Sequence, residues 1–244
     1  MTKKPLIGLS PSFYEHKEMD RSILGKSYTD NIQKAGGLPV LIPPIIDKQD
    51  LSQLLRRLDG VVLTGGDDLD PTYYGEQPGP KTPKVFHPRR GLNDKQIFEY
   101  AWENKLPTLA ICLGFQEANV FLGGSLYQDI PSQYNDPIIH KTGDWFDARH
   151  QVQLEAGSLL HHLTGKLSVE TNSAHHQAIK TVADQLKIGG RTEDGIIEVL
   201  EPRDASIPLL GVQWHPESET NDVVGINLLK WLVKQSADRA SISA

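Results

Sequence analysis

The first half of the chain alternates short runs of apolar residues with segments of helical periodicity. The apolar runs lie at 5–10, 38–44, 61–64 and 106–112. Between the second and third runs, Leu51, Leu54, Leu55 and Leu58 recur on one face of a predicted helix. Strands that are apolar on both faces are typical of a parallel sheet covered by helices on each side, with right-handed connections. The pattern therefore predicts an α/β fold built on a parallel sheet flanked by helices.

The second half of the chain has a different pattern. Four short segments in which polar and apolar residues alternate lie at 150–155, 166–172, 186–192 and 195–201. They predict a short antiparallel extension of the sheet. A closing helix is predicted at 221–235, followed by a frayed tail of small polar residues at 236–244. The Pro-, Gly- and Tyr-rich stretch at 70–90 predicts a long loop. Because no linker or repeat interrupts the chain, we interpret residues 1–244 as a single domain.

The composition argues against several classes of function. The 244 residues carry a net charge of −6, so the basic surface typical of nucleic-acid binding is not expected. No run approaches the roughly 18 apolar residues of a membrane span, and the apolar stretch from Leu6 to Leu9 is too short for a signal peptide. Cys112 is the only cysteine, which excludes an intramolecular disulfide. We therefore expect a cytoplasmic protein that binds neither nucleic acid nor membrane.

Cys112 lies where an apolar run ends and a helical pattern begins. Gly114 follows two residues later, and Phe115 and Gln116 open the helical pattern. A strand-to-helix turn of this kind can hold a nucleophile in a strained, accessible position. The free N–H groups and the positive end of the helix dipole would stabilise a thiolate there. The simpler interpretation is a small buried thiol at the end of a strand. A partner histidine is needed to decide between them.

A histidine that meets this need follows another apolar strand. His215 is followed two residues later by Glu217, and residues two apart on an extended chain project to the same side. Glu217 would then orient the imidazole as a base is oriented in a catalytic triad. The alternative is a surface histidine with an incidental acidic neighbour.

A third strand ends at Gly65 and Gly66, whose backbone N–H groups could point toward a developing oxyanion. The aspartates after these glycines do not have the spacing of a calcium-binding loop. A plain turn is the alternative interpretation of this segment.

These motifs occur in an order that resembles a known family. Cys112 lies in C-L-G-F-Q, and His215 and Glu217 lie in W-H-P-E. The other matching segments are GGDDLDPTYYGE, NVFLGGSLYQDI, NSAHHQAIK and RTEDGIIEVLE. Together they resemble the class I glutamine amidotransferase-like superfamily and, within it, the gamma-glutamyl hydrolase branch.

The resemblance implies a flavodoxin-like sheet and cleavage of the γ-glutamyl amide of a small-molecule substrate. Cys112 would form a glutamyl thioester, while His215, oriented by Glu217, would protonate the leaving amine and then activate water. The backbone N–H groups of Leu113 and of Gly66 (or Gly65) would hold the oxyanion. The residues implied to bind the substrate are Gly65, Gln116, Asn172, Ser173, His175 and Gln177. The resemblance implies no metal and no organic cofactor, and it leaves open a homodimer.

The sequence departs from this branch at three positions. Leu113 stands where the branch often carries arginine, so that a contact to a substrate carboxylate would be lost. Leucine at this place is common in glutaminase subunits that feed ammonia to a synthetase. Ala110 replaces a frequent glycine, and Gly91 replaces an aspartate. Two alternatives to a hydrolase therefore stay open: a glutaminase subunit with a synthetase partner, and a non-catalytic γ-glutamyl-binding protein.

Two pairs of adjacent histidines, His161-His162 and His175-His176, are the remaining candidates for metal ligands. Adjacent side chains diverge on a helix and on a strand alike, and neither pair belongs to an H-E-x-x-H motif. The sequence therefore predicts no metal site.

Overall fold

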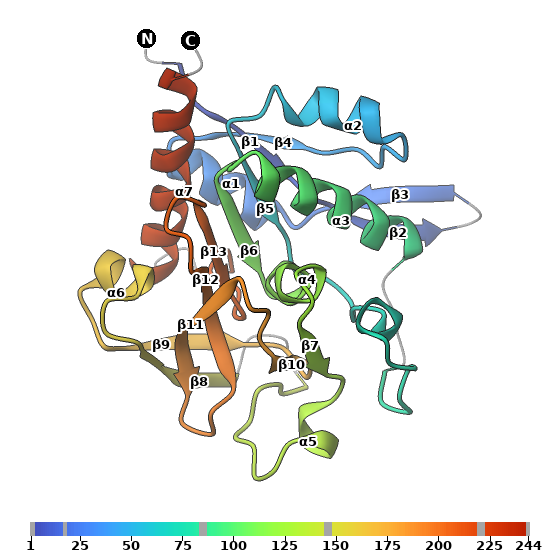
Figure 1. Cartoon of the computed structure of the whole chain (residues 1–244), viewed down its shortest axis with the longest axis vertical. Helices are drawn as coiled ribbons and strands as arrows, with labels where there is room; N and C mark the ends of the chain where they lie inside the picture. Colours follow the sequence, from blue (N-terminus) through green and yellow to red (C-terminus); the bar gives the residue numbers. More distant parts are fainter. Residues whose placement is uncertain (1–2, 17–18, 83–86, 144–147, 219–222, 243–244) are drawn as a thin grey trace.

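The predicted strands form one mixed sheet of nine strands (Figure 1). It is seen in a computed structural model, which describes residues 3–16, 19–82, 87–143, 148–218 and 223–242. In spatial order the strands are β4 (Leu38–Leu41), β1 (Leu6–Leu9), β5 (Gly60–Leu63), β6 (Thr108–Ile111), β13 (Leu209–Val212), β12 (Ile197–Pro202), β11 (Leu186–Thr192), β8 (Ala148–Leu154) and β9 (Ser168–Ser173).

The sheet has a parallel and an antiparallel part. The five strands from β4 to β13 are parallel to one another. From β13 onward each strand, through β12, β11 and β8 to β9, runs antiparallel to its neighbour. Every residue of β5, β6 and β13 is buried, as expected of strands covered on both faces. The predicted α/β fold with an antiparallel extension is confirmed.

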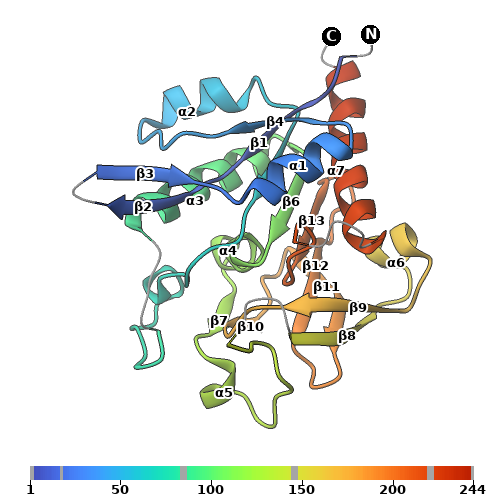
Figure 2. The same cartoon turned by 180° about the vertical axis from the view of Figure 1, so that it is seen from behind.

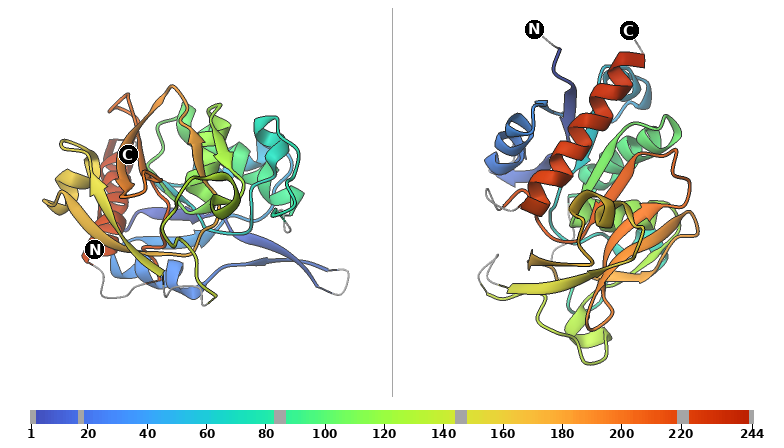
Figure 3. Two further views of the ribbon diagram at one scale, coloured as in Figure 1. Left: turned by 90° about the horizontal axis from the view of Figure 1, so that it is seen from below. Right: turned by 90° about the vertical axis from the view of Figure 1, so that its left-hand side faces the viewer.

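Helices cover both faces of the parallel part (Figures 1 and 2). One face carries α1 (Lys26–Lys34) and α7 (Val223–Ile242), which pack against each other and lie side by side in Figure 3. The other face carries α2 (Lys48–Leu55), α3 (Pro88–Glu103) and α4 (Leu113–Phe121). Along β6, Leu109 and Ile111 join the apolar cluster beneath α7, and Ala110 joins the cluster beneath α2 and α3. None of the described helices is long and apolar enough to cross a membrane.

Smaller elements extend this framework. They are two antiparallel pairs, β2 (Ser12–His16) with β3 (Met19–Ile23) and β7 (Ser125–Tyr127) with β10 (Ala178–Thr181), and the short helices η1 (Pro71–Tyr74), α5 (Ile130–Gln133) and α6 (Leu159–Thr164). The stretch predicted as one loop at 70–90 thus contains η1 and the start of α3. Residues 83–86 of that stretch lie outside the described part of the chain.

The predicted frayed tail is wrong for residues 236–242, because α7 continues to Ile242. Ser236 is fully buried, and its hydroxyl donates a hydrogen bond to the carbonyl oxygen of Leu232 at 2.8 Å. One turn later, the Arg239 guanidinium donates to the carbonyl oxygen of Asn104 at 2.9 Å. The burial of Ser236 and the bond from Arg239 to Asn104 tie the last turns of the helix to the domain, which the small polar residues of the sequence do not reveal.

Three of the parallel strands end next to one another at the same edge of the sheet. β6 pairs with β5 on one side and with β13 on the other, and Ile111 lies opposite Val212. The carboxyl ends of parallel strands are where α/β proteins place their ligand sites. Here those ends are followed by Gly65-Gly66, Cys112 and His215, so the topology brings the three predicted motifs to one place.

Candidate active site

Cys112 occupies a strained turn between β6 and α4. Its backbone has φ +50° and ψ −100°, outside the regions that non-glycine residues favour, and such a residue costs about 1–3 kcal/mol. The Cys112 N–H donates to the carbonyl oxygen of Val212 at 2.9 Å, which anchors the turn to β13. Gly114 is required beside it, since a Cβ at that position would collide with the backbone of Leu63. The sequence-predicted elbow is therefore present in the fold.

His215 lies between the Cys112 thiol and the Glu217 carboxylate. Its Nδ1 is 2.7 Å from Oε1 of Glu217, and both side chains are buried. Burial opposes a charge on the imidazole, but the neighbouring Cys112 and Glu217 outweigh it and raise the pKa of His215 well above its usual value. The arrangement can hold a proton on the imidazole beside Cys112.

Asn172 holds the backbone of His215 on both sides. Its amide Nδ2 donates to the carbonyl oxygen of His215 at 2.9 Å, and its Oδ1 accepts from the N–H of His215 at 3.0 Å. The same amide Nδ2 donates to Oγ of Ser218 at 3.0 Å. Asn172, predicted as a substrate ligand, thus fixes the segment that carries His215, and it does not line the pocket described below.

Tyr28, at the start of α1, is a site residue that sequence reasoning missed. Its hydroxyl accepts a hydrogen bond from the N–H of Gly65 at 3.0 Å and lies near the Glu217 carboxylate. Burial, reinforced by the charge of Glu217, raises the pKa of Tyr28 well above its usual value, so the phenol stays neutral. No spacing in the sequence links Tyr28 to Glu217, because the contact forms only when α1 packs on the sheet.

Two backbone N–H groups close to Cys112 have no hydrogen-bond partner in the described part of the chain. They belong to Gly66, after β5, and to Leu113, in the first turn of α4, where helical N–H groups have no partner within the helix. Gly65 was the alternative donor, but its N–H already donates to Tyr28. A side chain at Gly66 would collide with the guanidinium of Arg90. Gly66 and Leu113 are therefore the pair able to hold an oxyanion.

The loop that carries these glycines rests on a buried arginine. Arg90 Nη2 donates to the carbonyl oxygen of Thr64 at 2.8 Å, and its Nε donates to Asp94 Oδ2 at 3.1 Å. Arg90 and Asp94 are both almost fully buried. The buried ion pair fixes the end of β5 directly before Gly65.

A pocket of about 310 Å³ opens over Cys112. It is lined by Gly66, Asp67, Asp68, Cys112, Gln116, Lys141, Ala174, His175, His176, Gln177 and His215. A larger hollow of about 700 Å³ lies between α2 and α3. That hollow contains none of the predicted site residues, so we assign the site to the smaller pocket.

The predicted substrate-binding residues divide into two groups. Gln116, His175 and Gln177 line the pocket, and Gln116 Nε2 donates to the carbonyl oxygen of Gln177 at 3.3 Å. Ser173 lies behind the wall, where its fully buried hydroxyl donates to the carbonyl oxygen of His140 at 2.6 Å. The Leu113 side chain is also buried, in an apolar cluster with Leu69 and Phe115, and does not line the pocket.

The pocket also has charged groups to which the sequence assigned no role in binding substrate. His176 Nε2 is 2.8 Å from Asp68 Oδ1, and its Nδ1 is 3.2 Å from Asp129 Oδ1. The hydrogen bond with Asp68 outweighs burial and raises the pKa of His176. Lys141 supplies a positive charge to the same wall. In the sequence, the adjacent pair His175-His176 in the NSAHHQ segment was the signal for these groups. In the structure, the two side chains have different partners.

The fold is that of the glutamine amidotransferase-like class. A solved structure from Thermoplasma acidophilum, described as that of "a putative gmp synthase subunit a protein", has the same fold, with a TM-score of 0.67, 15% sequence identity and 99% and 98% of the two chains covered. Residues 5–217 match the model of the family described as Peptidase C26. The chain belongs to this family.

Two curated relatives span most of the chain. A protein named "Putative glutamine amidotransferase" from Mycobacterium tuberculosis is 35% identical, with 97% of this chain and 76% of the relative covered. Gamma-glutamyl-gamma-aminobutyrate hydrolase PuuD from Escherichia coli is 33% identical, with 89% of this chain and 87% of the relative covered. The family and these relatives support a hydrolase of the gamma-glutamyl hydrolase or amidotransferase type.

Proposed function

We propose that the protein hydrolyses the γ-glutamyl amide of a small molecule, with Cys112 as nucleophile, His215 as general acid and base, and Glu217 as the group that orients His215. One observation carries the proposal: the thiol stands on a strained strand-to-helix turn beside an imidazole whose Nδ1 is 2.7 Å from a buried carboxylate. A structural thiol needs neither the unfavourable φ nor the aligned base.

The reaction follows from the positions of these groups. The Cys112 thiolate attacks the side-chain carbonyl carbon of the γ-glutamyl group, and the N–H groups of Gly66 and Leu113 stabilise the oxyanion. His215 gives its proton to the departing amine, which leaves a glutamyl thioester on Cys112. Water then gives a proton to His215 as it attacks the thioester carbonyl. Glutamate departs, and the thiolate and the protonated imidazole are restored.

The lining of the pocket supports a glutamyl group as the bound half of the substrate. Asp68 and Lys141 place opposite charges on its walls, and such a pair matches the α-amino and α-carboxylate groups of a glutamyl residue. The volume of about 310 Å³ is small, which favours a small-molecule amide over a folded protein chain. The activity named for the Escherichia coli relative supports the same substrate class.

A glutaminase that supplies ammonia to a synthetase partner is the second candidate. It is favoured by the name of the Mycobacterium tuberculosis relative and by the description of the Thermoplasma acidophilum structure. The two candidates share the thioester chemistry and differ in the amine that leaves. Isolated protein that releases glutamate faster from γ-glutamyl-γ-aminobutyrate than from glutamine supports the hydrolase, and the opposite order supports the glutaminase.

The decisive experiment combines turnover with trapping of the thiol. We expect Cys112→Ala to lower glutamate release from a panel of γ-glutamyl amines by about 10³-fold or more. A glutamine-like diazo-ketone should alkylate Cys112 in the wild-type protein, as a mass increase on the peptide that contains it. A Cys112→Ala variant with full activity would contradict the mechanism. A wild-type protein that binds the amides but resists alkylation and releases no glutamate would be a binding protein.

A further inference from the structure

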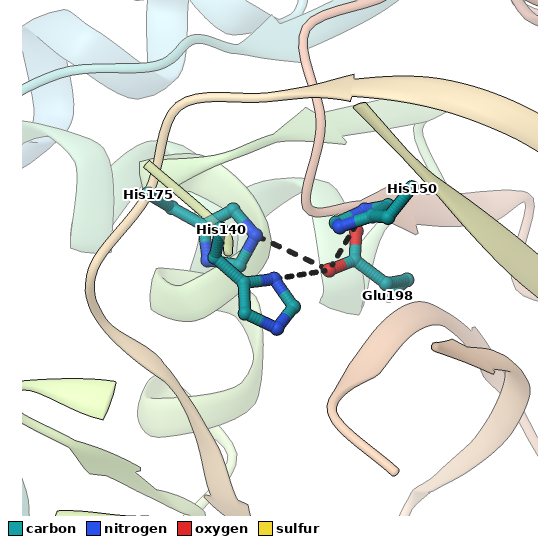
Figure 4. A group of neighbouring side chains, drawn as sticks. All are labelled: His140, His150, His175 and Glu198. Carbon is teal, nitrogen blue, oxygen red and sulfur yellow. Dashed lines mark ion pairs between the residues drawn. The ribbon is translucent and has the colours of Figure 1, made fainter. Parts of the chain in front are cut away.

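Behind the pocket wall, three histidines and one glutamate converge on a single buried point (Figure 4). His150 comes from β8, His175 follows β9, Glu198 lies on β12, and His140 lies on the segment before β8. Each side chain is at most 6% exposed. One ligand atom from each residue can be chosen so that all four atoms lie within 4.8 Å of one another. The cluster is separate from Cys112, His215 and Glu217, although His175 also lines the pocket.

The ring nitrogens that face the centre carry lone pairs in two of the histidines. His140 Nε2 is 2.9 Å from the Asp194 carboxylate, and His175 Nδ1 is 2.9 Å from the carbonyl oxygen of Gln177. Both partners are acceptors only, so these nitrogens carry the hydrogen. In the neutral imidazoles, Nδ1 of His140 and Nε2 of His175 are therefore the acceptor nitrogens, and both face Glu198.

This arrangement leaves an unsatisfied centre. Oε1 of Glu198 is 3.2 Å from Nε2 of His175, 3.5 Å from Nε2 of His150 and 3.8 Å from Nδ1 of His140. None of these four atoms has a hydrogen-bond partner in the part of the chain that the structure describes. A carboxylate oxygen surrounded by lone pairs in a dry interior is unfavourable unless a positive charge is present.

A metal ion supplies that charge better than protons do. Protonating all three imidazoles would set three buried cations against one carboxylate, at a large desolvation cost. One divalent cation at the centre accepts the lone pairs of all three neutral imidazoles and the charge of Glu198 together. The contacts of His140 with Asp194 and of His175 with Gln177 are also those that orient metal-binding histidines in proteins.

We propose that His140, His150, His175 and Glu198 form a binding site for a divalent transition-metal ion of the Zn²⁺ type. Three imidazoles and a carboxylate suit Zn²⁺ and its neighbours in the first transition row. Two ligands of a tetrahedral zinc lie about 3.3 Å apart when each is about 2.0–2.1 Å from the metal. The distances of 3.2, 3.5 and 3.8 Å from Glu198 to the three nitrogens are close to that spacing.

The proposed ion would tie the antiparallel extension to the pocket. It would link β8 and β12 to the segment after β9, where His175 forms part of the pocket wall. His175 contacts the carbonyl oxygen of Gln177, and the same oxygen accepts a hydrogen bond from Gln116. These contacts connect the proposed ion to residues that line the pocket. The ion takes no part in the thioester chemistry, so its role is to hold the wall in place.

Cobalt binding to the full chain, with any purification tag removed, tests the proposal. We use a Cys112→Ala background, so that the thiol cannot serve as a ligand, and titrate Co²⁺ while following its visible absorption bands. We expect one Co²⁺ per chain with bands of a four- or five-coordinate site, displacement by Zn²⁺, and a rise in melting temperature on binding. His150→Gln should weaken binding by about 100-fold or more, and Asp194→Asn by about 10- to 100-fold.

His162→Gln is the matched control, because His162 lies exposed on α6 and its Nδ1 contacts the carbonyl oxygen of Ser158. This variant should bind Co²⁺ as tightly as the background protein does. Equal losses in His162→Gln and His150→Gln would place the ion on the surface and overturn the proposal. Absence of saturable Co²⁺ and Zn²⁺ binding in the background protein would also overturn it. Asp194→Asn keeps the test valid if His150→Gln does not fold, since it leaves all four ligands in place.

Discussion

The protein contains two buried groupings of histidine with glutamate. They differ in whether the polar atoms that face one another form hydrogen bonds. At the strand ends, one imidazole stands between a thiol and a carboxylate, with Nδ1 of His215 2.7 Å from Glu217. Behind the pocket, three imidazole nitrogens face Glu198 at 3.2 to 3.8 Å, and none of these atoms has a hydrogen-bond partner among the described residues. In the first grouping, one proton on His215 can form the hydrogen bond to Glu217. In the second grouping, one proton cannot reach all three nitrogen lone pairs and the carboxylate, which is why we propose a bound metal ion there.

Replacing each glutamate by glutamine in turn tests whether the two groupings act independently. Glu217→Gln should lower kcat/KM for the γ-glutamyl substrate by about 10³-fold, because the amide cannot stabilise the imidazolium of His215. Glu198→Gln should leave most of kcat and instead lower the melting temperature and Co²⁺ affinity. Steady-state kinetics and thermal unfolding of both variants measure these effects. An equal loss of kcat/KM in the two variants would show that both glutamates are needed for catalysis and would contradict separate roles.

Asn172 offers a second test, because it acts on His215 through the backbone. Asn172→Ala removes two hydrogen bonds from the His215 main chain, at 2.9 and 3.0 Å, and leaves buried groups without partners. We expect stability to fall by about 1–3 kcal/mol, and kcat to fall by about 10²-fold because the imidazole is misplaced.

A positioning role predicts that KM changes little in Asn172→Ala, because the side chain does not line the pocket. Asn172→Asp keeps the acceptor for the His215 N–H and should lose less activity than the alanine variant. A large rise in KM with kcat preserved would instead identify Asn172 as a substrate ligand, as the sequence suggested.

The two groupings also differ in what the sequence reveals. Cys112 and His215 each follow an apolar strand, and parallel strands end at a common edge, so their meeting is predictable from strand order alone. The ligands of the second grouping lie at 140, 150, 175 and 198, on four segments brought together by antiparallel pairing and an irregular turn. No periodic pattern predicts that register.

Tertiary packing explains the remaining differences between sequence and structure. The pairing of Tyr28 with Gly65 and the burial of Ser236 depend on how α1 and α7 pack on the sheet. Intrinsic propensity carries no information about such contacts. By contrast, the elbow at Cys112 was predictable because glycine at 114 and the end of an apolar run are local signals.

The raised pKa of His215 predicts a pH dependence of stability. The group binds its proton more tightly in the folded state, because Cys112 and Glu217 outweigh the opposing effect of burial. Its contribution is therefore fully present below the unfolded pKa of about 6.5 and is lost as pH rises through the folded value. The difference in unfolding free energy between wild type and His215→Gln should shrink toward alkaline pH, as urea unfolding at several pH values can measure. A difference that grows with pH would contradict the charged pairing.

Leu113 is expected to give the smallest effect on substrate choice. Its side chain is 1% exposed, packs with Leu69 and Phe115, and does not line the pocket. Leu113→Ala should therefore lower stability by about 2–5 kcal/mol, and Leu113→Met by less than about 1.5 kcal/mol. The ratio of kcat/KM between γ-glutamyl-γ-aminobutyrate and glutamine should stay the same in both variants, measured below their melting temperatures. A changed ratio in Leu113→Met would mean that the side chain reaches the substrate after all and takes part in substrate choice.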